Sequence, residues 1–209
     1  MLIYIIRHGE TKANVDGVLQ GWDDFPLNEN GRKLAAITGR NMSDIRFDRC
    51  ISSPLIRAKE TAKIVLGESG NDIPIEEDER IKEINFGDYE KKSIKVPEMK
   101  QFFADPFLCP QFPNGESVRM VISRTYDFLR ELMELDDGKT YLVATHGCAL
   151  RAMLNHFYED KDNYWHGHVP YNCCVNIIEA AGGNAHLIAD DKIYYPPELV
   201  ADRYKGGKS

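Results

Sequence analysis

Short apolar runs and stretches of helical periodicity alternate along the first third of the chain. Residues 2–6 form a continuous apolar run rich in β-branched side chains, which is typical of a strand covered on both faces. Asn28, a residue type that often caps helices, precedes apolar side chains at helical spacing. Ser53-Pro54 combines a capping residue with proline at a first helical position, which predicts a second helix start. The predicted elements are strands over 2–6 and about 47–52, a loop from 7 to about 28, and helices over about 29–45 and 53–67.

The second half continues this alternation around one irregular stretch. Residues 80–86 are expected to be extended. Residues 87–115 contain four prolines and several phenylalanines and show no regular period. Apolar side chains from Val118 to Leu132 then recur at helical spacing, which predicts a long amphipathic helix. The remaining predicted elements are a strand over 140–145, a helix over about 149–158, and strands over 173–179 and 185–189.

Strands that alternate with helices favour an α/β fold of three layers, α/β/α, with a mostly parallel central sheet. We expect residues 1–209 to form a single domain, in which about 87–115 is an irregular insertion that covers the substrate.

Three predicted strand ends carry side chains that suit an anion. Arg7-His8 follows the first strand, Arg57 lies shortly after the second, and His146 follows the strand over 140–145. Ligands bind parallel sheets beyond the carboxyl ends of the strands. These side chains are therefore expected to face one crevice.

The composition is that of an ordinary globular protein, with 43% hydrophobic and 28% charged residues. The formal net charge is -7 and the isoelectric point about 5.4. Nucleic acids and anionic membranes require a basic surface, so no partner of either kind is expected. Any bound anion must be held by a local cluster of cations.

The five cysteines are odd in number and scattered, which does not fit a disulfide framework. We therefore expect reduced thiols and a cytoplasmic location. The N-terminal apolar run ends at Arg7-His8, too soon for a secretion signal or a membrane span. A homodimer remains open.

The charges at the three strand ends match a phosphomonoester. Its phosphate carries nearly two negative charges at neutral pH, and its oxygens suit the planar fork of arginine. Helix N-termini after Ser53 and after His146 would add oriented N–H groups. A neutral histidine can attack phosphorus, which makes His8 the candidate nucleophile. Gly9 would let the ligand approach the backbone.

The leaving alkoxide needs a proton from a general acid. Glu83 is the candidate, because it lies in the extended segment just before an irregular loop. The charge of a nearby phosphate would favour the protonated form of its carboxyl. The sequence contains no Walker A motif and no carboxylate cluster typical of a metal site. We therefore expect neither metal nor cofactor, and assign the electrostatics to the protein's own cations.

Arg7-His8-Gly9-Glu10-Thr11 resembles the signature of the histidine phosphatase superfamily, the phosphoglycerate-mutase-like proteins. Further similar blocks follow in order: Gln20-Gly21-Trp22-Asp23, Pro26-Leu27, 52–62, 80–90, Gly115-Glu116-Ser117 and Thr145-His146-Gly147. The matches span about residues 1–151, and a family-like terminal hairpin extends them nearly to the end. The resemblance is to the cofactor-independent phosphatase branch and implies a phosphoglycerate-mutase-like fold.

The resemblance implies a role for each matched residue. His8 would be the phosphorylated nucleophile, and Glu83 the proton donor and later the acceptor. Arg7, Arg57 and His146 would bind the phosphoryl oxygens. The other implied pocket positions are Asn14, Gln20, Gly21 and Gly147. The implied activity is that of a phosphoric monoester hydrolase of the histidine acid phosphatase type, acting on small phosphorylated metabolites.

Two residues depart from the family pattern near the expected position of the substrate's non-phosphate part. Lys91 and Cys148 each stand where the phosphatases often have glycine. At a helix start, the Cys148 thiol could also have a lowered pKa. His166-Gly167-His168 lacks further ligand residues at metal-site spacing and is interpreted as a surface loop.

Three functions are compatible with these motifs. Hydrolysis by a phosphatase is preferred over a cofactor-dependent phosphoglycerate mutase, since the mutases tend to be longer and carry Asn where Cys148 stands. An inactive phospho-ligand sensor or scaffold would usually have lost the nucleophile or the acid, and both are present. The sequence leaves open the substrate, the phosphatase subtype, the role of residues 194–209, and whether the aromatic segment over 97–113 is a lid.

Overall fold

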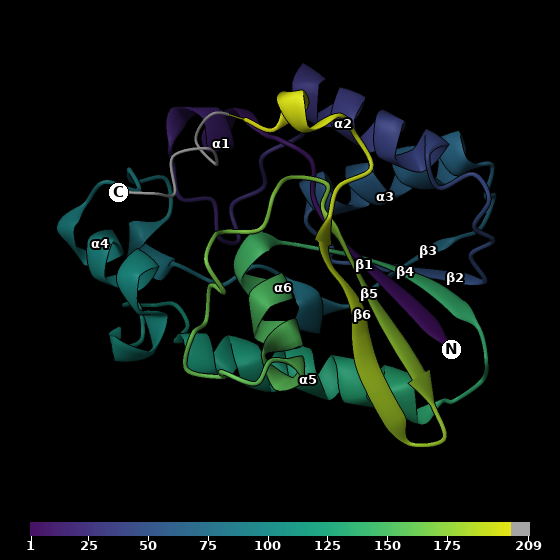
Figure 1. Cartoon of the computed structure of the whole chain (residues 1–209). Coiled ribbons are helices and arrows are strands. Elements are labelled where there is room, and N and C mark those ends of the chain that lie inside the picture. The colour runs from purple at the N-terminus through teal and green to yellow at the C-terminus, as the bar shows by residue number, and fades with distance from the viewer. Residues whose placement is uncertain (202–209) are drawn as a thin grey trace.

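The computed structural model describes residues 1–201 and has one six-stranded sheet at its centre (Figure 1). The strand order is β3-β2-β4-β1-β5-β6. The pairs β1–β4, β2–β4 and β2–β3 are parallel, whereas β5 pairs antiparallel with both β1 and β6. The strands are β1 (Leu2–Arg7), β2 (Arg49–Ser52), β3 (Ile75–Glu77), β4 (Thr140–Thr145), β5 (Val175–Ala181) and β6 (Asn184–Lys192).

The central position of β1 explains its continuous apolar sequence. Neighbouring strands flank it on both sides, and helices cover both faces, so Ile3, Ile5 and Ile6 are fully buried. Its register pairs Arg7 with Thr145 at the end of β4. The residues that follow β1 and β4 therefore leave the sheet side by side.

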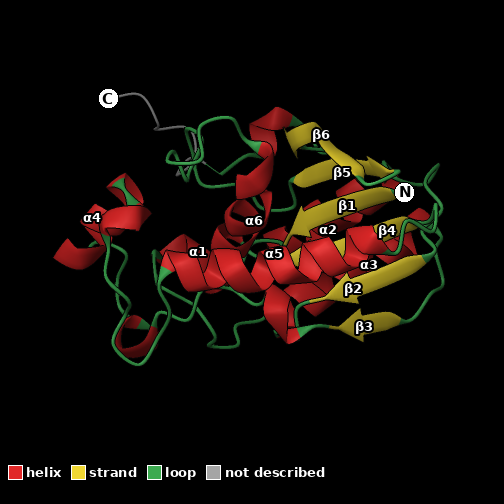
Figure 2. Cartoon of the chain, turned by 90° about the horizontal axis from the view of Figure 1, so that it is seen from below, coloured by secondary structure: helices red, strands yellow, loops and turns green. Residues whose placement is uncertain are grey.

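Helices form a layer on each side of the sheet (Figure 2), which confirms the predicted three-layer architecture. Leu34 of α2 and Ala58 of α3 pack in one core cluster with Ile6, whereas Phe128 of α5 and Leu150 of α6 pack in another on the opposite face. The helices are α1 (Lys12–Asp16), α2 (Glu29–Arg40), α3 (Ile56–Ser69), α4 (Pro97–Ala104), α5 (Val118–Glu134) and α6 (Gly147–Leu154), with 3₁₀ turns at Glu79–Ile81, Gly87–Tyr89, Pro106–Leu108, Asn155–Phe157 and Pro197–Leu199.

A third core cluster lies beside the sheet and contains part of the aromatic segment. Phe86, Phe102 and Phe112 pack edge to face, with ring centroids 5.2–5.7 Å apart. Met99 and Phe102 of α4 are buried in this cluster, whereas Phe103 is 37% exposed. Much of the stretch predicted to be irregular therefore packs into this third cluster, and a short helix, α4, begins at its first proline, Pro97.

Two helices begin at different residues from those predicted. α3 begins at Ile56 rather than at Pro54. The Ser53 hydroxyl contacts the His146 ring at 2.7 Å and also accepts from the Leu55 N–H at 3.3 Å. α6 begins at Gly147, directly after β4, and ends at Leu154. Ser53 therefore combines a local hydrogen bond to the backbone with a tertiary contact to His146.

Three elements are absent from the prediction or different from it. α1 lies inside the predicted loop, and β3 is an edge strand of three residues, too short to show a period. Residues 80–86, expected to be extended, begin within a 3₁₀ turn over Glu79–Ile81, and the rest is irregular.

Part of the C-terminal segment whose role the sequence leaves open is described. The buried Tyr195 hydroxyl donates a hydrogen bond to the carbonyl of Asn172 at 2.7 Å. Residues 202–209 lie outside the described residues. Within residues 1–201, no helix is both long and apolar enough to cross a membrane.

Two helical glycines provide a matched test of the close packing between α2 and α3. A Cβ on Gly39 would lie 2.7 Å from the carbonyl oxygen of Val65, whereas one on Gly67 would meet nothing within 4 Å. We expect Gly39→Ala to lower the free energy of unfolding by about 1–3 kcal/mol. Gly67→Ala should raise it by about 0.5–1 kcal/mol, since alanine favours the helix. Urea denaturation midpoints measure both; a stabilising Gly39→Ala would contradict the close approach.

Candidate active site

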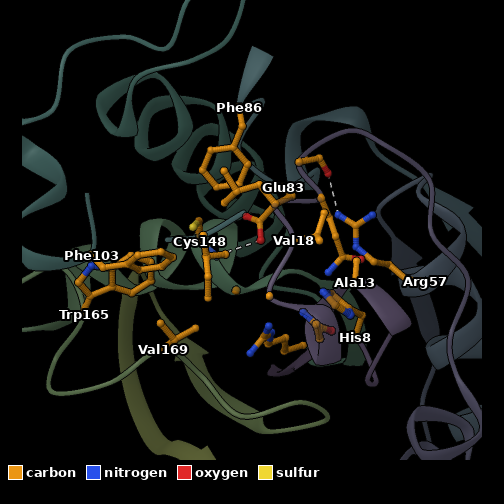
Figure 3. A pocket seen from close by; sticks show the side chains of 18 of the residues that line it. His8, Ala13, Val18, Arg57, Glu83, Phe86, Phe103, Cys148, Trp165 and Val169 are labelled. Carbon is orange, nitrogen blue, oxygen red and sulfur yellow. Dashed lines mark hydrogen bonds between the residues drawn. The ribbon is translucent and has the colours of Figure 1, made fainter. Parts of the chain in front are cut away.

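A cavity of about 460 Å³ lies beyond the carboxyl ends of β1, β2 and β4 (Figure 3). The structure brings together there most of the residues that the sequence singled out. Those lining the cavity are Arg7, His8, Asn14, Gln20, Gly21, Arg57, Glu83 and Gly147. His146 is fully buried and does not line the cavity; its ring centroid is 5.3 Å from that of His8.

His8 follows β1 and is fixed through its backbone and its ring. Its N–H donates to the carbonyl of Thr145 at 2.9 Å, and its carbonyl accepts from the Asn172 amide at 3.1 Å. Nδ1 lies 2.7 Å from the carbonyl oxygen of Gly9, which can only accept. In the neutral ring, Nδ1 therefore carries the hydrogen and Nε2 carries the lone pair.

His146 is held in the protein interior as a neutral ring. Burial, and then the charge of Arg57, lower its pKa well below the ordinary value. Nε2 contacts the Ser53 hydroxyl at 2.7 Å, whereas the buried Nδ1 has no hydrogen-bond partner within residues 1–201. A buried nitrogen of this kind is a candidate contact for a ligand oxygen.

Two buried arginines supply the positive charge of the site. Arg57 is fully buried and donates to the carbonyls of Gly21 at 2.7 Å and Asp23 at 2.9 Å. Burial lowers its pKa to about 10, so it remains a cation at neutral pH. Arg7 is 5% exposed and donates to the carbonyl of Pro170. These carbonyl acceptors orient the guanidinium groups without neutralising them.

Glu83 is bound to the start of α6. Its Oε1 accepts from the N–H groups of Ile84 and Ala149, both at 3.0 Å, and its Oε2 accepts from Cys148 at 3.3 Å (Figure 3). We expected these helical N–H groups to be available to a phosphate. That expectation is wrong for Cys148 and Ala149, since the carboxylate already caps this helix end.

Asn14 and Gln20 line the cavity with their amide oxygens already engaged. Asn14 Oδ1 accepts from the Thr11 N–H at 3.1 Å, within a capping box at the start of α1. Gln20 Oε1 accepts from the Thr11 hydroxyl at 2.9 Å. The donor ends of both amides therefore remain to face an anion.

Gly9 has a different role from the predicted one. A Cβ at this position would lie 2.7 Å from the carbonyl oxygen of Gly31 in α2. The absence of a side chain at Gly9 therefore makes room for α2. The expectation that it lets a ligand approach the backbone is not supported.

Sequence-based reasoning missed a clamp that holds the segment carrying Glu83. Arg124 of α5 donates to the carbonyls of Arg80 and Lys82, both at 2.7 Å, and of Glu83 at 2.9 Å. Its remaining N–H groups bind the Glu116 carboxylate at 2.7 and 2.8 Å. All five donors are thus used. The Gly115-Glu116-Ser117 motif was the available signal, but the sequence alone gives it no partner.

A second clamp fixes the carbonyls that orient Arg57. The Glu90 carboxylate accepts from the N–H groups of Trp22 at 2.8 Å and Asp23 at 3.1 Å. A Cβ on Gly21, whose φ is +52°, would lie 2.1 Å from this carboxylate. Burial raises the pKa of Glu90. Glu90 was part of a recognised block, yet only the fold shows what it holds.

The two departures from the family pattern have different positions. Lys91 does not line the cavity; its ammonium forms an ion pair with Asp23 at 2.7 Å. Cys148 does line it, but burial, and then the charge of Glu83, raise the pKa of its thiol well above the ordinary value. The suggestion of a lowered pKa at this helix start is therefore wrong.

His166 and His168 are engaged separately. His166 stacks on Tyr158 with ring centroids 3.6 Å apart, and His168 stacks on Tyr171 at 4.6 Å. Within the described residues, no group of three or more His, Cys, Asp or Glu side chains is arranged to hold a metal.

The sequence also matches the model of a known protein family. The model described as the histidine phosphatase superfamily (branch 1) matches residues 3–189. The chain belongs to this superfamily.

Relatives of the chain include proteins named as phosphatases and proteins named as mutases. The fructose-2,6-bisphosphatase TIGAR of Xenopus tropicalis is 39% identical over 220 residues, covering 95% of this chain and 79% of its own. A 2,3-bisphosphoglycerate-dependent phosphoglycerate mutase of Cytophaga hutchinsonii is 31% identical over 163 residues, covering 74% of this chain and 76% of its own. The structure of Bacillus stearothermophilus YhfR superimposes with a TM-score of 0.84 at 34% identity, covering 92% of this chain and 97% of that one.

The Arg124 clamp predicts a measurable effect on the segment that carries Glu83. Arg124→Lys keeps the charge but loses the planar fork, so the Glu83 segment should loosen. We expect faster amide hydrogen exchange over 80–86 and about 10- to 100-fold lower kcat with an alkyl phosphate, since small misplacements of reacting groups are costly. Arg130→Lys, on the exposed side of the same helix, is the control. Unchanged exchange in Arg124→Lys would contradict the clamp.

Proposed function

We propose that the protein is a phosphatase that hydrolyses small phosphomonoesters through a phosphohistidine on His8. The observation that carries this proposal is the placement of His8 beside Arg7, Arg57 and Glu83 on one cavity. A nucleophilic nitrogen, two cations and one acid are the groups that phosphoryl transfer from an ester to histidine requires.

In the first step, Nε2 of His8 attacks phosphorus, and the bond between phosphorus and the ester oxygen breaks. Arg7 and Arg57 bind the phosphoryl oxygens and balance their charge in a buried site. Glu83 donates its proton to the departing alkoxide, which leaves as an alcohol. The dianionic ester favours the protonated form of Glu83 that this step needs.

In the second step, water attacks the phosphohistidine, and the bond between phosphorus and Nε2 breaks. Glu83, now a carboxylate, accepts a proton from the water. Inorganic phosphate leaves, and His8 returns to its neutral form. The hydrogen bond from Nδ1 to the Gly9 carbonyl keeps the ring in one tautomer throughout.

His146 contributes a neutral donor rather than a charge in this proposal. If its Nε2 accepts from the Ser53 hydroxyl, Nδ1 carries the hydrogen and can donate to a phosphoryl oxygen. The low pKa produced by burial keeps the ring from adding a third cation to the site.

Phosphoglycerate mutase activity is the second candidate, because the Cytophaga hutchinsonii relative carries that name. A mutase must hold a substrate with a carboxylate and a second phosphate position. Among the described residues that line the cavity, the permanently charged cations are Arg7 and Arg57, both beside His8. This distribution favours hydrolysis. Isomerisation of 3-phosphoglycerate in the presence of 2,3-bisphosphoglycerate would instead support the mutase.

His8→Ala should abolish turnover, because it removes the atom that is phosphorylated. We expect phosphate release from p-nitrophenyl phosphate to fall by at least about 10³-fold, which corresponds to roughly 4 kcal/mol of transition-state stabilisation. The assay contains EDTA so that adventitious metals do not contribute. An inert wild-type protein would support the sensor alternative instead.

Glu83→Gln should slow departure of poor leaving groups most. We expect kcat for an alkyl phosphate to fall by about 10²–10⁴-fold, the usual contribution of a general acid. The fall should be much smaller for p-nitrophenyl phosphate, whose leaving group hardly needs a proton. An equal loss for both esters would show that Glu83 is not the acid.

A further inference from the structure

The cavity has two chemically different ends. Arg7, His8, Arg57 and Glu83 form what we call the phosphate end. The other end, which we call the apolar end, is lined by Phe86, Phe103, Trp165 and Val169. In Figure 3, Phe103 and Trp165 lie next to each other on the side of the pocket opposite His8 and Arg57.

The apolar end contains both buried aromatic side chains and a side chain that is partly exposed to solvent. Phe86 and Trp165 are buried and pack against Phe102, with ring centroids 5.7 and 5.8 Å apart. Phe103 remains 37% exposed although it lines the cavity. A ligand that covers Phe103 would remove apolar surface from water without rearranging the core.

Among the described residues that line the apolar end, none offers a free charged group to a second anion. His168 lines this end, but its Nδ1 contacts the carbonyl of Val169 at 2.9 Å and its Nε2 pairs with Asp191 at 3.3 Å. Two lysines of the neighbouring loop are directed elsewhere: Lys91 pairs with Asp23, and Lys92 lies over the ring of Tyr89. A carboxylate or second phosphate would lose its hydration here without gaining a partner from the described residues.

We propose that the preferred substrate is the phosphate monoester of an uncharged alcohol whose apolar group, about the size of an aromatic ring, fills the apolar end. This inference rests on the proposed phosphatase function. On this inference, bisphosphates and phosphoglycerates are not the preferred substrates, even where the protein hydrolyses them.

A series of primary alkyl phosphates tests the proposal, because their leaving groups are similar and differences report on binding. Ethyl, butyl, hexyl and 2-phenylethyl phosphate are compared with 3-phosphoglycerate by inorganic phosphate release. We expect KM to fall by about two- to fourfold per methylene until the apolar end is filled, with little change in kcat. We expect kcat/KM for 3-phosphoglycerate to be at least about tenfold below that for 2-phenylethyl phosphate.

Phe103→Ser connects this preference to the apolar end. Its KM for 2-phenylethyl phosphate should rise by about tenfold, whereas its KM for ethyl phosphate should stay within about twofold. Leu108→Ser is the matched control, since Leu108 is a 68% exposed apolar residue that does not line the cavity. Equal effects of both variants on 2-phenylethyl phosphate would overturn the assignment.

The outcomes separate the substrate class from the phosphatase function. Turnover with no dependence of KM on the apolar group, or with 3-phosphoglycerate preferred, would overturn the substrate class and leave the phosphatase standing. If no ester is hydrolysed, the phosphatase proposal fails. Titration calorimetry with 2-phenylethylphosphonate and ethylphosphonate then tests the apolar end directly: at least about tenfold tighter binding of the former supports it, and equal binding overturns it.

Discussion

The structure depends on keeping two guanidinium groups charged inside a buried pocket. Arg7 and Arg57 repel one another, and burial already lowers the pKa of Arg57. Like charges in a poorly solvated site are tolerated only when surrounding dipoles are arranged for them. Backbone carbonyls of Gly21, Asp23 and Pro170 supply such dipoles, and the charge of Glu83 also raises the pKa of Arg57 against the effect of burial. The site is therefore preorganised for an anion, and the energy needed to assemble it comes from the folding of the rest of the chain.

The loops that carry these carbonyls are irregular, so side chains take over the task that hydrogen-bond ladders perform in helices and strands. Glu90 fixes the backbone of residues 22–23, and Arg124 with Glu116 fixes residues 80–85. Each clamp uses a charged group to satisfy several backbone groups at once. Mobile loops would instead lose the orientation of Arg57 and Glu83 with every fluctuation.

Much of the fold could be predicted because the relevant patterns are local. The apolar run of β1 and the helical spacing of α2 and α5 correspond to fixed periods and to burial. The convergence of His8, Arg57 and His146 followed from the rule that ligands bind at strand ends. Elements shaped by distant contacts were not predictable: β3 is a three-residue edge strand, and α4 lies between prolines in an aromatic cluster.

The sequence by itself determined the chemistry: which nucleophile, cations and acid the protein has, and that parallel strand ends bring them to one edge. Only the tertiary structure decided how each is used. It binds two N–H groups of α6 to the Glu83 carboxylate and packs Gly9 against α2. It buries the Cys148 thiol, which raises the pKa of that thiol. It also places the apolar end of the cavity apart from its phosphate end. The physical reason is that residue identity and hydrophobic periodicity depend only on a residue and its neighbours in the sequence. Hydrogen-bond partners, desolvation and shape depend on groups that only folding brings within contact distance.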